Sequence, residues 1–271
     1  MRKMCWNRLV ADELTAVDDG AEPMVISGLR KTFGEKVAVD SVDLTVGRGS
    51  FFGLVGPNGA GKTTTLSMAV GLLRPDAGSV RIFGVDVWQE PAKAKSLIGV
   101  LPDGLAVPER LTGRELLVYS GLLRGLDRDV TEARADELLQ VMGLDEAERT
   151  LIIDYSAGMR KKIGLANALL HAPKLLILDE PFEAVDPVSA ATIRTILTRF
   201  VAAGGAVVLS SHVMALVELM CDHVGVMSDG AVVAAGPVDE VRGGEQGLEQ
   251  AFVALVGARN DGVEGLEWLA S

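Results

Sequence analysis

The apolar and polar positions of this chain follow three successive patterns. In the early part, strict alternation over 40–46 predicts a strand with one buried face, and shorter apolar runs predict strands at 25–29, 50–55 and 78–84. A helix is expected at 65–73, after a glycine-rich turn. The early part is therefore expected to be rich in strands.

The spacing becomes helical between 111 and 151, where apolar residues recur at every third or fourth position. The later part alternates again, with strands predicted at 175–178, 206–210 and 224–227 and helices at 187–201 and 213–221. The interval 98–103 is expected to be a loop, and 1–22 an extension outside the fold. Strands that alternate with helices predict an α/β core into which a helical segment is inserted.

A glycine-rich motif stands between the predicted strand at 50–55 and the helix after it. The motif matches G-x-x-x-x-G-K-[ST] and consists of Gly56, Pro57, Asn58, Gly59, Ala60, Gly61, Lys62, Thr63 and Thr64. Its glycines let successive N–H groups point at phosphate oxygens, and a helix start adds the positive end of its dipole. Lys62 is expected to reach the outer phosphates, and Thr63 to take one coordination position of Mg²⁺. The chain is therefore predicted to bind a nucleoside triphosphate.

A second motif follows the apolar residues at 175–178, where Asp179 and Glu180 end the predicted strand. The carboxyl end of a buried parallel strand faces the ligand crevice of an α/β fold. Asp179 is expected to hold Mg²⁺, directly or through water, and Glu180 to orient or deprotonate the attacking water. Together with the glycine-rich motif, this pair predicts hydrolysis of the bound nucleotide.

Composition narrows the class of protein. The 271 residues carry a formal net charge of −11, which disfavours a general attraction to nucleic acid or to anionic lipid. The two cysteines, Cys5 and Cys221, form no metal-ligand or disulfide pattern, which fits a reducing, cytoplasmic compartment. We find no signal peptide, and no window holds the roughly 18 to 20 apolar residues of a membrane span. The chain is therefore expected to be soluble.

With four further positions, these motifs resemble the ATPase subunit of an ABC transporter, over residues 24 to about 256. Phe33 matches the aromatic residue on which that family stacks adenine. Tyr155-Ser156-Ala157-Gly158-Met159 occupies the place of the signature sequence, which caps the γ-phosphate bound by the opposite subunit. Asp186 matches the loop that passes between subunits, and His212 matches the histidine that contacts the γ-phosphate.

The resemblance implies an α/β fold, a P-loop NTPase with an ABC-type nucleotide-binding domain: a RecA-like core, an antiparallel β subdomain and an inserted helical subdomain. The expected parts are an N-terminal extension at 1–23, an ATPase domain at 24–240 with its helical subdomain at about 104–165, and a short helical tail at 241–271. The predicted site comprises the catalytic residues Lys62, Glu180 and His212, the Mg²⁺ ligands Thr63, Asp103 and Asp179, and ATP contacts from Phe33, from 56–64, and from Ser156 and Gly158.

Three positions depart from the commonest family pattern. Ala157 replaces a glycine of the signature, Met159 replaces its glutamine, and Asp103 stands where a glutamine is usual. The methyl group of Ala157 is compatible with an αR or β backbone. An ionised Asp103 could ligate Mg²⁺ but could not donate a hydrogen bond to the attacking water, which would weaken hydrolysis. The runs 155–162, 179–187 and 248–256 are similar to the ATPases of ABC-2-type exporters.

The resemblance implies a subunit that binds and hydrolyses ATP to power an exporter of a drug, lipid, glycan or antibiotic. Its expected partners are a separate multi-span permease and a second cassette, identical or related, with no nucleic acid, and its expected place is the cytoplasmic face of the membrane. Two alternatives stay open. One is a soluble ABC ATPase acting on ribosomes or DNA, a class that usually carries two cassettes or a long coiled coil. The other is a regulatory module with little hydrolysis, which Asp103 and Ala157 would favour.

Overall fold

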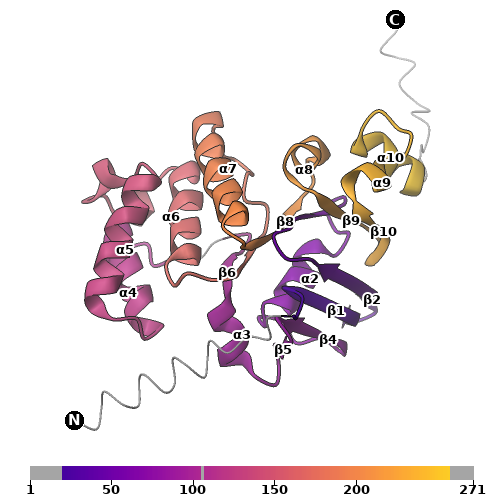
Figure 1. Ribbon diagram of the computed structural model, residues 1–271, viewed down its shortest axis with the longest axis horizontal. Coiled ribbons are helices and arrows are strands. Elements are labelled where there is room, and N and C mark those ends of the chain that lie inside the picture. Colours follow the sequence, from indigo (N-terminus) through magenta and orange to yellow (C-terminus); the bar gives the residue numbers. More distant parts are fainter. Residues whose placement is uncertain (1–19, 105–106, 257–271) are drawn as a thin grey trace, which may run out of the picture.

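The computed structural model describes residues 20–104 and 107–256, which form two sheets and the helices around them (Figure 1). The first sheet is antiparallel in the order β2-β1-β4-β5, with β1 (Met24–Phe33), β2 (Lys36–Val46), β4 (Ala77–Ile82) and β5 (Val85–Asp86). The second sheet has the order β10-β9-β3-β8-β7-β6 and consists of β3 (Phe51–Val55), β6 (Ile98–Leu101), β7 (Leu175–Leu178), β8 (Ala206–Ser211), β9 (His223–Ser228) and β10 (Ala231–Pro237). Its strands pair in parallel except at β10.

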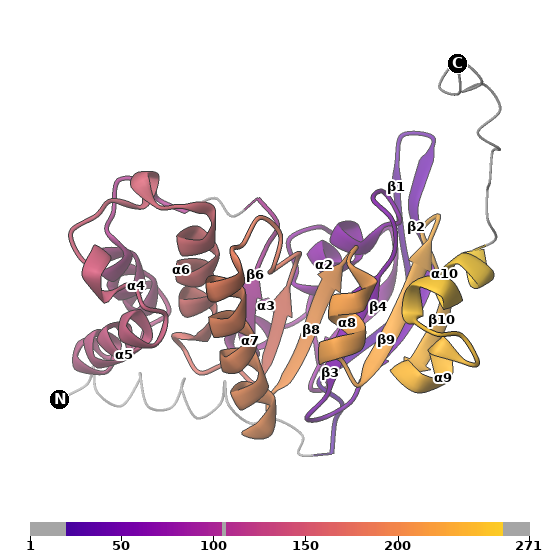
Figure 2. The same cartoon turned by 90° about the horizontal axis from the view of Figure 1, so that it is seen from above.

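The helices fall into three groups along the chain. The first is α2 (Lys62–Ala69) and α3 (Pro91–Leu97), beside the antiparallel sheet. The middle group is α4 (Gly113–Leu123), α5 (Arg128–Val141), the 3₁₀ turns Asp145–Ala147 and Ile152–Asp154, and α6 (Ala157–Leu169). The last group is α7 (Pro187–Ala202), α8 (Met214–Met220), α9 (Val238–Arg242) and α10 (Leu248–Val256). In Figures 1 and 2, α4 and α5 lie at one end of the molecule and α9 and α10 at the other.

Two hydrophobic cores lie on the two faces of the parallel sheet, and β7 contributes to both. Leu176 and Leu178 pack into a core with residues of α6 and α7, whereas Leu175 and Ile177 pack into a core with residues of α2 and the antiparallel sheet. Figure 2 shows α7 and α8 along one face of this sheet and α2 on the other. A parallel strand covered on both faces needs apolar residues at every position, which is the pattern from which 175–178 was predicted.

The antiparallel sheet confirms the alternation predicted at 40–46. In β2 the side chains of Val42, Leu44 and Val46 are buried, and those of Asp43 and Thr45 are exposed. The strand begins earlier than predicted, at Lys36, because it continues in a hairpin with β1. The predicted strands and helices of the late part are also confirmed, with ends that differ by no more than a few residues.

Two local predictions were wrong. The interval 98–103 was expected to be a loop, but Ile98–Leu101 forms β6, which pairs with β7 at the edge of the parallel sheet. Gly99 obscured it in the sequence, and the reason for this glycine is tertiary: a Cβ there would collide with the carbonyl oxygen of Ala168 in α6. The helix expected at 65–73 instead spans Lys62–Ala69, because it begins directly at the end of the glycine-rich loop.

The helical segment is stabilised at its helix starts. Thr112 and Glu115 form a capping box at α4, in which each side chain accepts a hydrogen bond from the backbone N–H of the other residue. Asp127 accepts hydrogen bonds from two N–H groups at the start of α5. These caps fix the residues at which α4 and α5 begin, and the helices then bury apolar residues in the core that contains α6.

The predicted terminal parts lie largely outside the described residues. Of the extension at 1–23 only its last residues are described, and of the tail at 241–271 the described part contains the end of α9 and all of α10. In the part of the chain that is described, no helix combines the length and the hydropathy needed to cross a membrane.

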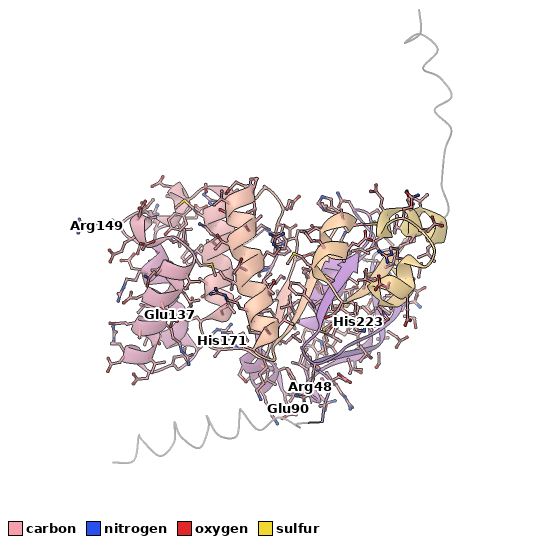
Figure 3. All side chains as sticks on the ribbon, turned by 45° about the horizontal axis from the view of Figure 1, so that its top comes forward. Arg48, Glu90, Glu137, Arg149, His171 and His223 are labelled. Atoms are coloured by element: carbon pink, nitrogen blue, oxygen red, sulfur yellow. The ribbon has the colours of Figure 1, made fainter. Side chains whose placement is uncertain are left out.

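His171 joins the helical segment to the core, at the point labelled in Figure 3. It follows α6, and its Nε2 lies 2.9 Å from the carbonyl oxygen of Ile98 at the start of β6. Its Nδ1 is buried, and within the described residues it has no hydrogen-bond partner. Burial lowers the pKa of His171 to about 4, and the nearby cations of Arg124 in the α4–α5 turn and Arg134 in α5 contribute to this.

We expect this histidine to make the fold less stable in mild acid. The unfolded chain binds a proton at His171 with the ordinary pKa of 6.5, whereas the folded chain does so only near pH 4. Acidification from pH 7.5 to 5.5 therefore protonates the unfolded state alone and lowers the free energy of unfolding by roughly 1–2 kcal/mol. Urea denaturation at both pH values measures this loss, and His171→Gln should reduce it by that amount. An identical pH dependence in the variant would contradict the assignment.

Candidate nucleotide-binding site

The glycine-rich loop connects β3 to α2 as the sequence predicts. Gly61 precedes α2 with φ of 102°, a left-handed conformation that residues with a side chain rarely adopt. A Cβ at Gly61 would also lie 2.6 Å from the carbonyl oxygen of Ala38. Both the backbone conformation and the lack of space therefore exclude larger residues at this position. The loop can therefore curl tightly enough to present its backbone N–H groups to one anion.

Lys62 is the first residue of α2, and its side chain is only 6% exposed. Its Nζ donates to the carbonyl oxygens of Gly56, at 2.8 Å, and Pro57, at 3.3 Å, so the ammonium is held against the loop. Burial lowers the pKa of Lys62 from its ordinary value, an effect that the carboxylates of Glu180 and Asp179 partly offset. The loop and this ammonium together provide the positive potential that a phosphate chain needs.

The predicted metal ligands gather beside the loop. Thr63, Asp103 and Asp179 line one recess of about 60 Å³. Asp179 is 5% exposed and accepts a hydrogen bond from the hydroxyl of Ser210, which leaves its other carboxylate oxygen free of that bond. Hydroxyl and carboxylate oxygens are the donors that Mg²⁺ prefers, so these residues fit the ion.

Among the described residues, no three His, Cys, Asp or Glu side chains form a cluster that could hold a metal by itself. At nucleotide sites, Mg²⁺ is commonly held by one or two protein ligands together with phosphate oxygens and water. Asp103 is exposed, and its carboxylate accepts a hydrogen bond from the N–H of Gly104. The Asp103 carboxylate is therefore less enclosed than that of the buried Asp179.

Glu180 lies next to Asp179, at the carboxyl end of β7, with its side chain 12% exposed. Its Oε1 is 3.0 Å from Nδ1 of His212 and 3.9 Å from Nζ of Lys62. The backbone of Glu180 has φ of 45°, an unusual conformation for a residue with a side chain. The three residues predicted to be catalytic thus meet around one carboxylate oxygen, although they are far apart in the sequence.

Most of the predicted site residues line one open cleft of about 460 Å³. The cleft is bounded by Phe33, Asp103, Glu180, His212 and the loop residues Asn58, Gly59, Ala60, Gly61, Lys62, Thr63 and Thr64. Phe33 is 50% exposed, so it is not a core residue, and the ammonium of Lys31 lies 5.7 Å from its ring centre. An exposed aromatic face at the mouth of a phosphate site suits the predicted stacking of a base.

The sequence analysis missed three residues that also line this cleft, namely Lys36, Ala38 and Glu183. Lys36 and Ala38 belong to the start of β2, directly after the hairpin from Phe33. Proximity to Phe33 was the one signal available for them. Glu183 follows the second motif by a tight turn, in which its N–H donates to the carbonyl oxygen of Glu180.

The signature residues Ser156 and Gly158 lie outside this cleft, at the start of α6. The hydroxyl of Ser156 accepts a hydrogen bond from the N–H of Met159 and so caps the helix. Gly158 packs against the loop of Asp186, where a Cβ would lie 2.9 Å from Oδ2 of Asp186. Within one chain, Gly158 therefore contacts the loop predicted to pass between subunits, and neither Ser156 nor Gly158 is among the residues that line the nucleotide cleft.

Ala157 is the first residue of α6 and lies in the helix itself. An αR conformation accommodates alanine better than glycine, so its departure from the family pattern costs nothing in backbone conformation. Met159 is half-buried against the core that contains α6 and α7. These departures therefore leave the start of the helix intact.

Comparison with known proteins identifies what this site is similar to. Residues 39–183 match the family described as "ABC transporter". The linearmycin resistance ATP-binding protein LnrL of Bacillus subtilis is 35% identical over 84% of this chain and 76% of its own length. The daunorubicin resistance ATP-binding protein DrrA3 of Streptomyces coeruleorubidus is 37% identical over 86% and 73%, and the bacitracin transport ATP-binding protein BcrA of Enterococcus faecalis is 36% identical over 79% and 68%.

Solved structures share the fold. The structure described as the ATP binding subunit of an ABC transporter superimposes with a TM-score of 0.80 at 28% identity, and covers 86% of this chain and 99% of its own. A nucleotide-free ATP-binding cassette gives a TM-score of 0.72 at 24% identity over 88% of this chain and 96% of its own, which supports the fold alone.

Proposed function

Because this chain belongs to the ABC transporter family as an ATP-binding subunit, we propose that it powers the export of a drug or antibiotic through a separate membrane-spanning permease. The observation that carries the proposal is the cleft in which the glycine-rich loop, Lys62, Glu180 and His212 meet. The relatives named for resistance to linearmycin or daunorubicin, or for transport of bacitracin, support the class of cargo.

Hydrolysis in this cleft follows from the positions of the side chains. The N–H groups of the loop and the ammonium of Lys62 hold the phosphates in line for attack. Oε1 of Glu180 is placed to accept a hydrogen bond, and then the proton, from the attacking water, while His212 at 3.0 Å fixes the orientation of that oxygen. Mg²⁺ held by Thr63 and Asp179 would neutralise charge on the phosphates during transfer.

A second cassette completes the site in this proposal. Ser156 lies outside the cleft of its own chain, yet it begins α6 with a hydroxyl and N–H groups suited to a phosphate. In a head-to-tail dimer with twofold symmetry, each Ser156 would reach the nucleotide of the other chain. ATP would then join the two cassettes, and hydrolysis would let them separate, which is the mechanical step that a transporter needs.

We propose that the permease contacts the groove beside Asp103 and the outer face of α4. Tyr119 and Leu123 of α4 are 53% and 69% exposed, a large apolar exposure for a helix at the end of the molecule (Figure 2). An apolar patch at such a place is suited to a protein partner.

Purification of tagged Glu180→Gln from native membranes with ATP present tests the proposal, because blocked hydrolysis should preserve the assembled complex. We expect a multi-span membrane protein to copurify in fixed proportion. A matched variant that also carries Leu123→Asp should lose this partner and keep its ATP binding. Ribosomal or chromosomal partners, with no membrane protein, would overturn the proposal in favour of a soluble ATPase.

A further inference from the structure

Lys161 makes a contact with the catalytic carboxylate residue that the mechanism above does not use. It lies in α6, five positions after Ser156, and its side chain is half-buried. Its Nζ donates a hydrogen bond of 2.8 Å to the backbone carbonyl oxygen of Glu180. An ammonium that donates to a carbonyl away from bulk water is a strong and directional contact.

The backbone of Glu180 needs such a partner. Its φ of 45° is a left-handed conformation that persists only when surrounding groups hold it. Its N–H donates to the hydroxyl of Ser210 at 3.0 Å, and its carbonyl accepts from the N–H of Glu183 at 3.2 Å. Ser210 lies near the end of β8, and Glu183 lies in the turn that follows Glu180. Neither of these partners belongs to α6.

Through this hydrogen bond, Lys161 connects α6 directly to Glu180. If the carbonyl group moved away while the N–H stayed bonded to Ser210, φ of Glu180 would change. Rotation about the N–Cα bond moves Cβ together with the carbonyl carbon, so the carboxylate would be displaced. Oε1 would then leave its place 3.0 Å from His212 and 3.9 Å from Lys62. A small rotation of this kind has a large effect on rate, because a general base acts only within hydrogen-bond reach of its proton.

We propose that Lys161 is a positioning residue for hydrolysis, which holds the Glu180 backbone in the conformation that directs its carboxylate into the cleft. Ser156 and Lys161 belong to the same helix. Ser156 is exposed at the start of α6, and Lys161 lies about 7.5 Å further along it. In the dimer of the proposed function, engagement of Ser156 by the second nucleotide would therefore be transmitted to Glu180 of the same chain.

The first experiment measures steady-state ATP hydrolysis by the purified chain, which requires no permease. Lys161→Met keeps the length of the side chain and removes the charge, so it should lower kcat roughly tenfold and leave KM for ATP within about twofold. Lys161→Arg should restore most of the rate, since a guanidinium can still donate to the carbonyl. Lys93→Met in α3 is the matched control for the loss of one half-buried lysine and should change neither constant, since the Lys93 side chain is 27% exposed and pairs with Glu90 at 3.8 Å.

A double-mutant cycle separates positioning from a general structural role. In the Glu180→Gln background, Lys161→Met should reduce the residual rate by less than about twofold, because its effect acts through the missing carboxylate. An equal fold-loss in both backgrounds would overturn the proposal, as would a raised KM with unchanged kcat. If the Met variant does not fold, Lys161→Gln supplies the same comparison. These outcomes stand apart from the export proposal, because a permease enters none of the assays.

Discussion

Glu180→Gln should reduce steady-state ATP hydrolysis by about 10²- to 10⁴-fold, the usual cost of losing a general base. Glutamine keeps the shape of the side chain and its contact with His212, but it cannot take a proton from water. ATP affinity should therefore change little, and the variant should form a dimer in ATP that size-exclusion chromatography separates from the monomer. The dimer should dissociate when ATP is removed.

The control for this experiment is Glu137→Gln, an exposed glutamate of α5 that lies far from the cleft (Figure 3). It makes the same chemical change and should leave turnover at the rate of the unmodified chain. Turnover in Glu180→Gln within about twofold of that rate would refute the role assigned to Glu180 and would show that another group acts as the general base. A slow rate in the unmodified chain would support the weakly hydrolysing alternative instead.

Lys62→Met should weaken ATP binding by about 10- to 100-fold, because it removes a buried cation that is predicted to donate charge-assisted hydrogen bonds to phosphate. Methionine matches the length and apolar stem of lysine, so the loop should keep its fold. The ammonium also lies near Glu180 and Asp179, and its loss leaves these carboxylates unbalanced beside the phosphates. Isothermal titration calorimetry with a nonhydrolysable ATP analogue measures the effect directly.

Lys62→Arg tests whether charge alone is sufficient. The guanidinium is larger and planar, and Lys62 is enclosed by the carbonyl oxygens of Gly56 and Pro57. We therefore expect the arginine variant to recover little of the affinity that the methionine variant loses. Full binding by the methionine variant would show that the loop N–H groups hold the phosphates without the lysine side chain, and full binding by the arginine variant would show that a positive charge at this position is sufficient.

The Asp186 loop lies between Glu180 and α7 and contacts the start of α6. Asp186 caps α7 by accepting hydrogen bonds from the N–H groups of Ser189 and Val188. The bonds from the backbone and hydroxyl of Ser189, and then from Val188, hold the pKa of its carboxyl below the ordinary value. The same carboxylate lies against Gly158 of the signature. The turn from Glu180 to Asp186 is thus bounded by α6 at both ends, by Lys161 at the first and by Gly158 at the second.

Of the three departures from the family pattern, those at Ala157 and Asp103 bear on the rate of hydrolysis, and they lie in different surroundings. Ala157 lies in a helix, where alanine is favourable, so it provides no reason to expect weak hydrolysis. Asp103 lines the cleft and the recess that it shares with Thr63 and Asp179, but it is exposed, and it accepts a hydrogen bond from the N–H of Gly104. The regulatory alternative therefore depends on Asp103 alone.

The sequence by itself determined the parts of this protein whose physics is local. The glycine-rich loop lies within one short segment between a strand and a helix, so its phosphate-binding geometry follows from backbone conformation. The run at 175–178 is apolar at each position because both faces of β7 are covered, and that burial places Asp179 and Glu180 at the ligand edge.

Only the tertiary structure decided which distant groups meet. The strand β6 was not predicted because it contains Gly99, a residue that is uncommon in strands. Gly99 is required by the close packing of α6 against the strand, which the local sequence does not show. Two contacts join segments that are distant in the sequence: Ser210 donates to Asp179, and Lys161 donates to Glu180. The pattern of apolar and polar residues gives no information about which distant segments meet. A motif specifies the atoms that bind a nucleotide, whereas the conformation of the catalytic carboxylate depends on packing, which acts between residues far apart in the chain.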